Sequence, residues 1–236
     1  LLRNKPKLLV LNKADLASPE LTQAWLQWFK EQGTATVAFS ALHDRREKLI
    51  VAIRSLAERP AARRFGPLRV LVAGIPNVGK SAVNNKLVGR RSAKVGDRPG
   101  VTKGQQWLRV ARDLELLDTP GLLWPKFVDQ ETGFRLAAVG AIRKEVLPEE
   151  EVAYWLAGEL IRLSPLALQS IDQAEGRTPA EVIESVAKRR GLYLSGGRLD
   201  LERAADILIR EFQQGKLGTI TLEEPGEKGL RDETST

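Results

Sequence analysis

The sequence predicts an α/β fold in which a mostly parallel sheet has helices on both faces, followed by a small all-helical domain. In the first half, short apolar runs alternate with segments of helical periodicity, a pattern typical of parallel β-α-β units. A glycine-rich turn at residues 74–81 joins one apolar run to a helix. After Pro125 helical patterns dominate, and the next strand-like segment is Thr219–Leu222.

The strands of the first half are expected at residues 7–11, 35–39, 68–73, 106–110 and 114–118. The first is nearly all apolar, as a strand buried on both faces should be. A helix over about residues 19–32 is framed by Ser18 as its N-cap, Pro19 as its first residue and Gly33 as its stop. Its apolar side chains repeat at helical spacing and are expected to face the core; they are Leu21, Trp25, Trp28 and Phe29. Further helices are expected at about 45–57 and 80–88.

Residues 58–67 interrupt this alternation and are predicted to be a linker inside a first domain that spans residues 1–126. The helical domain is expected at 127–224, with a flexible tail at 225–236. Within the helical domain, Thr178-Pro179-Ala180-Glu181 has the form of a capping box. Asp200 is expected to cap another helix, which ends near Gly215.

The charge of the chain is distributed unevenly. Residues 1–126 carry 23 Lys and Arg against 10 Asp and Glu, whereas residues 127–225 carry 12 against 17. A basic half attracts polyanions, most commonly nucleic acid, and a solvated basic surface is the alternative. No cysteine is present, which excludes disulfides, and no apolar run reaches the ~20 residues that cross a membrane. We expect a cytoplasmic protein, a monomer in preference to an oligomer. The absence of methionine leads us to expect a sequence that lacks its true N-terminus, or is engineered or otherwise incomplete.

The segment Gly74-Ile75-Pro76-Asn77-Val78-Gly79-Lys80-Ser81 matches the phosphate-binding pattern G-x-x-x-x-G-K-[ST] without a mismatch. Its glycines let backbone N–H groups approach phosphates, here those of Asn77, Val78 and Gly79, and the helix N-terminus adds partial positive charge. Lys80 is expected to reach the β- and γ-phosphates, and the Ser81 hydroxyl to bind Mg²⁺.

Two further segments complete the expected triphosphate site. Asp118-Thr119-Pro120-Gly121 follows an apolar strand, so that Asp118 would hold Mg²⁺ and the Gly121 N–H would meet the γ-phosphate. Thr102 is the only threonine between the phosphate-binding loop and Asp118, and it is the candidate switch residue that closes over Mg²⁺ and the γ-phosphate. A plain turn and a plain loop threonine are the alternatives for these two segments.

The base-recognition residues are expected earlier in the chain. Asn12-Lys13-Ala14-Asp15 has the form N-K-x-D, in which the Asp15 carboxylate would accept from N1–H and the exocyclic amine of guanine. Adenine offers no such pair of donors, so this motif selects guanine. Ser40-Ala41-Leu42, after the next strand, would direct a backbone N–H at guanine O6. The motifs therefore predict a P-loop GTPase in circularly permuted order, and they disfavour a metabolic kinase.

The permuted order and the segments at 74–81, 97–107, 116–127 and 215–223 resemble the bacterial ribosome biogenesis GTPase A (YlqF) family over essentially the whole chain. The resemblance implies a GTP-hydrolysing assembly factor for the large (50S) ribosomal subunit that binds ribosomal RNA in its GTP state. It also implies a helical C-terminal domain similar to ANTAR-type RNA-binding domains. A nucleotide-gated RNA-binding module with little hydrolysis is the alternative.

Two departures from the family pattern bear on catalysis. The family begins with a further helix and strand, including a histidine-bearing segment, whereas the only histidine here is His43, predicted to be an exposed loop residue. Leu122 stands where Ras-like enzymes carry the water-positioning glutamine, so slow intrinsic turnover that the ribosome stimulates is expected. Asn77 is similar to an asparagine that binds K⁺ in related GTPases, in place of an arginine finger. Lys80, Thr102, Gly121 and Asn77 are thus the expected catalytic residues.

The RNA-binding residues are expected in both domains. The densest basic regions, at 45–69 and 86–103, lie in the GTPase half, whereas the acidic helical domain has one basic cluster at the end of a helix. A solvated helix end is the alternative for that cluster. The candidate RNA contacts are Arg63, Arg64, Arg90, Arg91, Lys188, Arg189 and Arg190.

Overall fold

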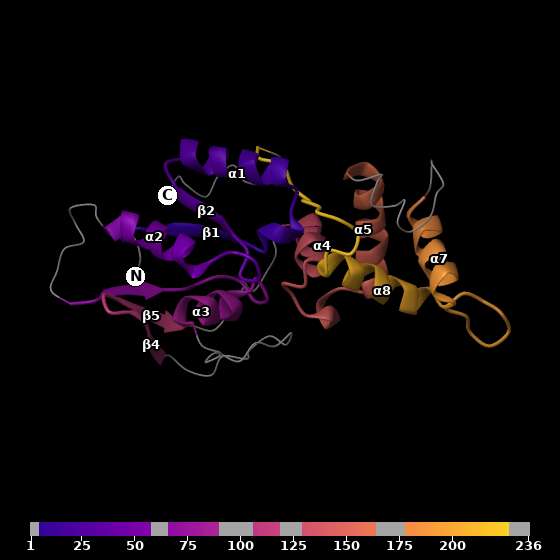
Figure 1. Ribbon diagram of the computed structural model, residues 1–236. Coiled ribbons are helices and arrows are strands. Elements are labelled where there is room, and N and C mark those ends of the chain that lie inside the picture. Colours follow the sequence, from indigo (N-terminus) through magenta and orange to yellow (C-terminus); the bar gives the residue numbers. More distant parts are fainter. Residues whose placement is uncertain (1–4, 58–65, 90–105, 119–128, 164–177, 227–236) are drawn as a thin grey trace. The chain divides into compact units, whose positions relative to one another are not determined.

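A computed structural model describes residues 5–57, 66–89, 106–118, 129–163 and 178–226. The chain divides into two compact units (Figure 1). The first comprises Leu1–Leu123 together with Glu223–Thr236, and the second comprises Trp124–Leu222. The described strands all lie in the first unit, and the second unit is helical.

The strands of the first unit form two sheets. Strands β1 (Leu8–Asn12) and β2 (Ala35–Phe39) pair in parallel. In the second sheet, β5 (Leu114–Asp118) pairs in parallel with β3 (Leu68–Leu71) and antiparallel with β4 (Gln106–Ala111). The predicted strands agree with these bounds to within two residues, and the mostly parallel α/β class is confirmed.

One apolar core connects the two sheets. It joins Phe39 of β2 to Leu114 and Leu116 of β5 through the buried residues of helices α2 (Arg46–Ala57) and α3 (Lys80–Val88). These helix residues are Leu49, Ile50, Val83 and Leu87. Polar contacts reinforce the packing, because the Arg54 guanidinium pairs with Asp113 at 2.8 Å and Arg46 donates to the Leu87 carbonyl at 3.3 Å. The carboxyl ends of β1, β2 and β3 are thereby held by a shared core.

Helix α1 (Pro19–Glu31) begins as predicted, with Ser18 accepting from the Leu21 N–H and Pro19 in the first turn. The prediction that its apolar residues face the core overestimated their burial, because no residue of α1 is buried. Instead the rings of Trp25, Trp28 and Phe29 pack on one another, with centroids 4.9–5.6 Å apart. The helix packs along β2, and it contributes none of the buried residues of the core between α2 and α3.

The second unit contains helices α4 (Gln130–Ala138), α5 (Glu149–Leu163), α7 (Pro179–Arg190) and α8 (Leu201–Gln213). Leu156 of α5, Val186 of α7 and Leu208 of α8 meet in its core and are fully buried. The Thr178–Glu181 capping box and the Asp200 N-cap are both present, as predicted. No helix in the described part of the chain is long and apolar enough to cross a membrane.

The segment Thr219–Leu222 is not a strand, contrary to the prediction. Its alternating pattern has another cause, because Ile220 and Leu222 are buried in the core of the helical unit while the backbone is irregular. No strand is described in that unit with which the segment could form a ladder. The alternation of apolar and polar residues here therefore reflects burial of one side of an irregular segment and not a strand.

A buried carboxylate fastens α7 to α8. Glu211 of α8 is only 4% exposed, and it accepts from Arg189 at 3.3 Å and from Arg190. The two guanidiniums are partly exposed, at 37% and 45%. A buried carboxylate is tolerated only when such partners compensate its lost hydration.

We predict that Glu211→Gln loosens the helical unit by about 1–3 kcal/mol, because charge-assisted hydrogen bonds are lost at a buried position. Hydrogen–deuterium exchange of peptides from α7 and α8 measures this locally. Glu131→Gln is the control, since Glu131 is 56% exposed and its ion pair with Arg135 should contribute less than about 1 kcal/mol. Equal protection in both variants would contradict the assigned role of Glu211.

Candidate nucleotide site

The phosphate-binding loop runs from the end of β3 to the start of α3. Gly79 caps α3 with a φ of 90°, and Asn77 has a left-handed φ of 55°, a conformation that is uncommon for a residue with a side chain. Helix α3 begins at Lys80, so the N–H groups of its first turn lie beside the loop. The Lys80 ammonium donates to the Ile75 carbonyl at 2.6 Å and therefore lies across the loop. This geometry suits an anion with several oxygens.

The guanine motif at the end of β1 touches the phosphate-binding loop directly. The Asn12 side-chain amide donates to the Val78 carbonyl at 2.8 Å, although the two residues are 66 positions apart. A Cβ atom at Gly79 would lie 2.3 Å from the Asn12 Nδ2 atom, so only glycine permits this approach. The Asn12 Oδ1 atom is buried and has no hydrogen-bond partner among the described residues.

The predicted base-recognition residue, Asp15, lies in the short 3-10 helix Ala14–Leu16 that follows β1. Lys13, immediately before it, has a left-handed φ of 58°, which turns the chain sharply after the strand. The Asp15 carboxylate is 20% exposed and thus accessible from one side. His43 Nε2 lies 3.9 Å from it, and the His43 side chain is 72% exposed. His43 is therefore an exposed loop residue, as predicted, but it borders the guanine motif.

Asp44 organises the loop after β2, and sequence reasoning did not identify it. Its carboxylate accepts from the Ser40 N–H at 2.9 Å and from the Lys48 ammonium at 2.9 Å. These contacts, the Ser40 N–H first, lower the pKa of Asp44, so the carboxylate is charged at neutral pH. The Ser40 hydroxyl in turn accepts from the His43 N–H at 3.2 Å. The sequence did contain a signal for this role, namely an acidic residue four positions after Ser40 and just before a helix.

The structure thus places two of the predicted motifs in contact and a third on the same unit. Asn12 meets the loop that carries Asn77, Val78, Gly79, Lys80 and Ser81. Ser40, Ala41 and Leu42 follow β2, the parallel neighbour of β1; Ser40 is buried and Leu42 is 77% exposed. Other predicted residues lie outside the described residues: Thr102, Gly121, Leu122, Arg63, Arg64, Arg90 and Arg91.

The predicted Mg²⁺ ligands are only partly described. Ser81 lies in the first turn of α3, and Asp118 is the last residue of β5, the strand that pairs with β3. No group of three or more metal-binding side chains occurs among the described residues. The hydroxyl of Ser81 has the chemistry that Mg²⁺ accepts in GTPases of this class.

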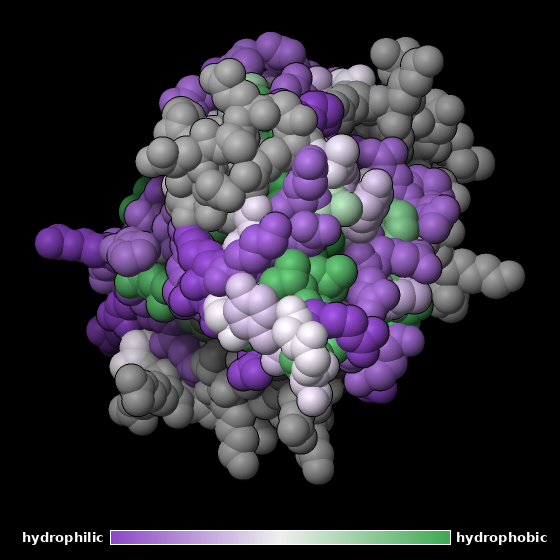
Figure 2. Space-filling view, turned by 90° about the vertical axis from the view of Figure 1, so that its right-hand side faces the viewer, coloured by the Kyte–Doolittle hydropathy of each residue, from purple (hydrophilic) through white to green (hydrophobic). Residues whose placement is uncertain are grey.

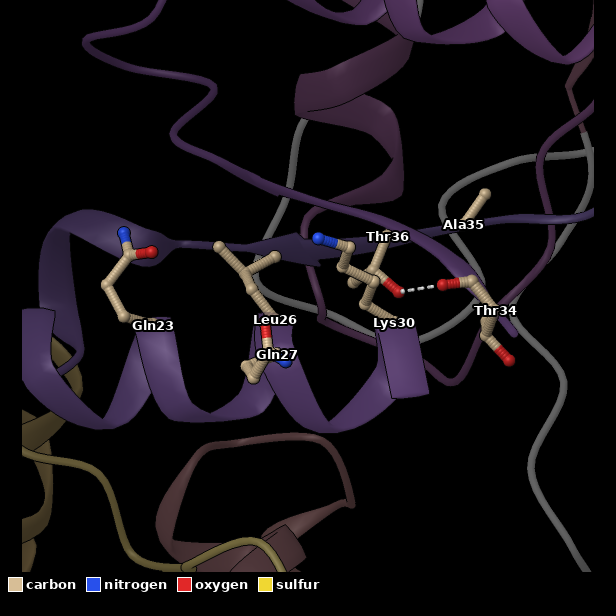
Figure 3. Close-up of a pocket in the computed structure, with 7 residues that line it drawn as sticks. All are labelled: Gln23, Leu26, Gln27, Lys30, Thr34, Ala35 and Thr36. Carbon is tan, nitrogen blue, oxygen red and sulfur yellow. Dashed lines mark hydrogen bonds between the residues drawn. The ribbon is translucent and has the colours of Figure 1, made fainter. Parts of the chain in front are cut away.

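A separate hollow of about 300 Å³ lies between α1 and the start of β2 (Figure 3). Polar side chains line it, among them Gln27 and Lys30 of α1 and Thr36 of β2. It lies at the amino end of β2, whereas ligands of parallel sheets bind at the carboxyl ends of the strands. The hollow is therefore distinct from the site formed by Asn12 and the phosphate-binding loop.

We predict that Gly79→Ala weakens GTP binding at least about tenfold, because its methyl group would displace Asn12 and the backbone would be strained at positive φ. Titration with a fluorescent GTP analogue measures the change. Gly33→Ala is the matched control: Gly33 also has a positive φ, of 70°, but an added Cβ would meet nothing within 4 Å. Its GTP affinity should equal that of the original chain, and equal losses in both variants would contradict the close approach of Asn12.

Comparison with known proteins places this site in a family. Residues 69–187, half of the chain, match the family model described as a 50S ribosome-binding GTPase. Ribosome biogenesis GTPase A of Bacillus cereus is 39% identical, in an alignment that covers 97% of this chain and 80% of that protein. The protein of the same name from Thermotoga maritima is 32% identical, covering 94% of this chain and 77% of that protein.

Solved structures agree with the sequence relatives. A GDP-bound YlqF structure matches with a TM-score of 0.70 and 28% identity, covering 92% of this chain and 83% of that one. GNP-bound YlqF from T. maritima matches with a TM-score of 0.68 and 29% identity, covering 93% and 82%. Both cover the two units described above. The chain therefore belongs to the ribosome biogenesis GTPase A (YlqF) family and is a GTP-binding, GTP-hydrolysing protein.

Proposed function

We propose that this GTPase is an assembly factor for the large ribosomal subunit, which it joins through ribosomal RNA in its GTP state. The names of the relatives and of the family model support the ribosomal role. The observation that carries the nucleotide dependence is the hydrogen bond from Asn12 to Val78, because it makes the guanine motif and the phosphate-binding loop one site.

In this proposal each motif has a separate task. The Asp15 carboxylate accepts from guanine N1–H and the exocyclic amine, and a backbone N–H of Ser40–Leu42 meets O6. Lys80 leaves the Ile75 carbonyl and turns to the β- and γ-phosphates, with the N–H groups of residues 77–79 around them. Ser81, Thr102 and Asp118 hold Mg²⁺, which neutralises charge on the phosphates, and the Gly121 N–H binds the γ-phosphate.

The point where the two units are connected supports a mechanism by which the helical unit could respond to the bound nucleotide. Gly121 is the residue expected to respond to the γ-phosphate, and the helical unit begins at Trp124. A change of backbone position at Gly121 therefore acts within three residues of the helical unit. The position or the order of the helical unit would then depend on whether GTP or GDP is bound. The RNA contact would change with it.

We propose further that Asn77 binds K⁺ next to the phosphates. Its left-handed backbone sets it at the turn of the loop, and Leu122 supplies no water-positioning group. A cation at this point would offset the charge that develops during hydrolysis, as an arginine finger does in other GTPases. GTP hydrolysis should then be faster in potassium than in sodium buffer at equal ionic strength. Equal rates would remove the K⁺ proposal and leave the rest unchanged.

Co-sedimentation with purified ribosomal subunits tests the proposed function. We expect retention on large subunits with a non-hydrolysable GTP analogue, and little retention with GDP or on small subunits. Asp15→Asn is the control for nucleotide dependence, because it should lose retention with the GTP analogue and regain it with the xanthosine analogue. Equal retention in every nucleotide state, or none on the large subunit, would overturn the proposal.

A further inference from the structure

An exposed hairpin follows α7 in the helical unit. Gly191 ends α7 in the left-handed conformation, and an antiparallel bridge between Tyr193 and Leu199 closes the hairpin. Backbone hydrogen bonds hold it together. The Leu194 N–H donates to the Arg198 carbonyl at 2.7 Å, and at the base the Asp200 N–H donates to the Leu192 carbonyl. In Figure 1 it is the orange loop that projects beyond α7. The hairpin is therefore a built element that extends away from its own core.

Side chains that normally seek burial are exposed on this hairpin. All residues from Tyr193 to Arg198 are exposed, with Tyr193 at 56% and Leu194 at 46%. The tip is Gly196-Gly197, both at positive φ, and a Cβ at either would meet nothing within 4 Å. Figure 2, which faces this side, shows a small apolar area beside weakly polar atoms, bordered by hydrophilic ones. Tyr193 and Leu194 belong to no core of the described fold, whereas the tip is held by the Gly197 N–H, which donates to the Leu194 carbonyl at 3.1 Å.

Positive charge is concentrated beside the hairpin. Residues 188–198 contain four of the 12 Lys and Arg of residues 127–225 and no Asp or Glu, although that region is acidic as a whole. Arg189 and Arg190 both pair with the buried carboxylate of Glu211 and are themselves 37% and 45% exposed, so two partly exposed guanidiniums lie at the end of α7. Arg198 has no carboxylate partner among the described residues. Lys188 pairs with Glu184 at 3.4 Å and adds little.

We propose that this hairpin is a contact for unpaired RNA, in which the Tyr193 ring stacks on a base. Arg198 and the partly exposed guanidiniums at the end of α7 attract the phosphates, and the Gly196-Gly197 tip has no side chain that would keep an RNA strand away. An aromatic ring beside guanidiniums fits a nucleic acid better than a protein, because Tyr193 and Leu194 are the large apolar side chains exposed on the hairpin, and a protein interface has a broader apolar centre. The inference rests on the proposed RNA-binding function and names the part of the helical unit that performs it.

The charges on either side of the hairpin also indicate which way a bound RNA strand would run. A hollow of about 400 Å³ at the start of α8 is lined by four carboxylates and two guanidiniums, those of Glu149, Asp200, Glu202, Asp206, Arg203 and Arg210. Its net negative charge repels phosphates, whereas the two partly exposed guanidiniums at the end of α7 attract them. The RNA strand accordingly runs from the hairpin toward the end of α7 and avoids the start of α8.

Fluorescence anisotropy with a labelled RNA hairpin that has an unpaired loop, and with deproteinised large-subunit RNA, tests this contact. The full chain is used with a non-hydrolysable GTP analogue at two salt concentrations. Tyr193→Ala should weaken RNA binding about tenfold with the salt dependence unchanged, because stacking is lost. Arg198→Ala should weaken RNA binding and also make it less sensitive to salt. The slope of the logarithm of the association constant against the logarithm of the salt concentration should fall by about one, as expected for the loss of one phosphate contact.

Matched controls come from the same unit. Tyr154 on α5 is 53% exposed, and Arg143 is exposed, so Tyr154→Ala and Arg143→Ala should bind RNA as the original chain does. GTP affinity should be unchanged in all four variants, since none lies in the nucleotide site. RNA binding by the original chain with no loss in either hairpin variant would overturn this inference and leave the proposed function standing. No RNA binding by the original chain would overturn both. Loss of subunit retention with unchanged affinity for free RNA would assign the hairpin to a ribosomal protein instead.

Discussion

The hydrogen bond between the Asn12 amide and the Val78 carbonyl is the contact on which the nucleotide site depends. It joins the carboxyl end of β1 to the turn before α3, and these segments are far apart in the sequence. Because Gly79 has no side chain, the amide can reach the loop at all. The bond also explains why permuted motif order is harmless here. A GTP site requires strand ends and loops in the right places in space, and the shared core of α2 and α3 holds both sheets there.

Local rules predicted most of the elements and many of their ends. Ser18, Thr178 and Asp200 cap helices as expected, because capping depends on a few neighbouring residues. Burial is a property of tertiary neighbours, and there the sequence misled: α1 stacks its aromatic rings on one another, and Ile220 and Leu222 are buried without a strand. The Asn12–Val78 bond and the role of Asp44 were hidden for the same reason. Each motif was recognisable alone, whereas the contact between motifs depends on the fold.

The basic cluster at residues 188–190 shows how charge in a sequence differs from charge available to a partner. Lys188 pairs with Glu184, and Arg189 and Arg190 are occupied by the buried Glu211, which fastens α7 to α8. Both guanidiniums remain partly exposed, so a structural role does not abolish an electrostatic one. The contact with Glu211 fixes where they lie, just before the Tyr193–Leu199 hairpin. A loss of α7–α8 packing would therefore also displace these two charges.

The helical unit is an insertion between two segments of the GTPase unit. The chain enters it after Leu123 and returns at Glu223, whose carbonyl accepts from the Trp25 indole N–H at 3.1 Å. The ring of Trp25 also stacks on Phe29, so the side chain that binds the returning segment is itself packed on α1. The helical unit is thus joined to the GTPase unit at both of its ends, and the segment that follows its return point is bound to α1. In the proposed function, a response of the helical unit to the nucleotide therefore has to begin at its entry, because its return point is held.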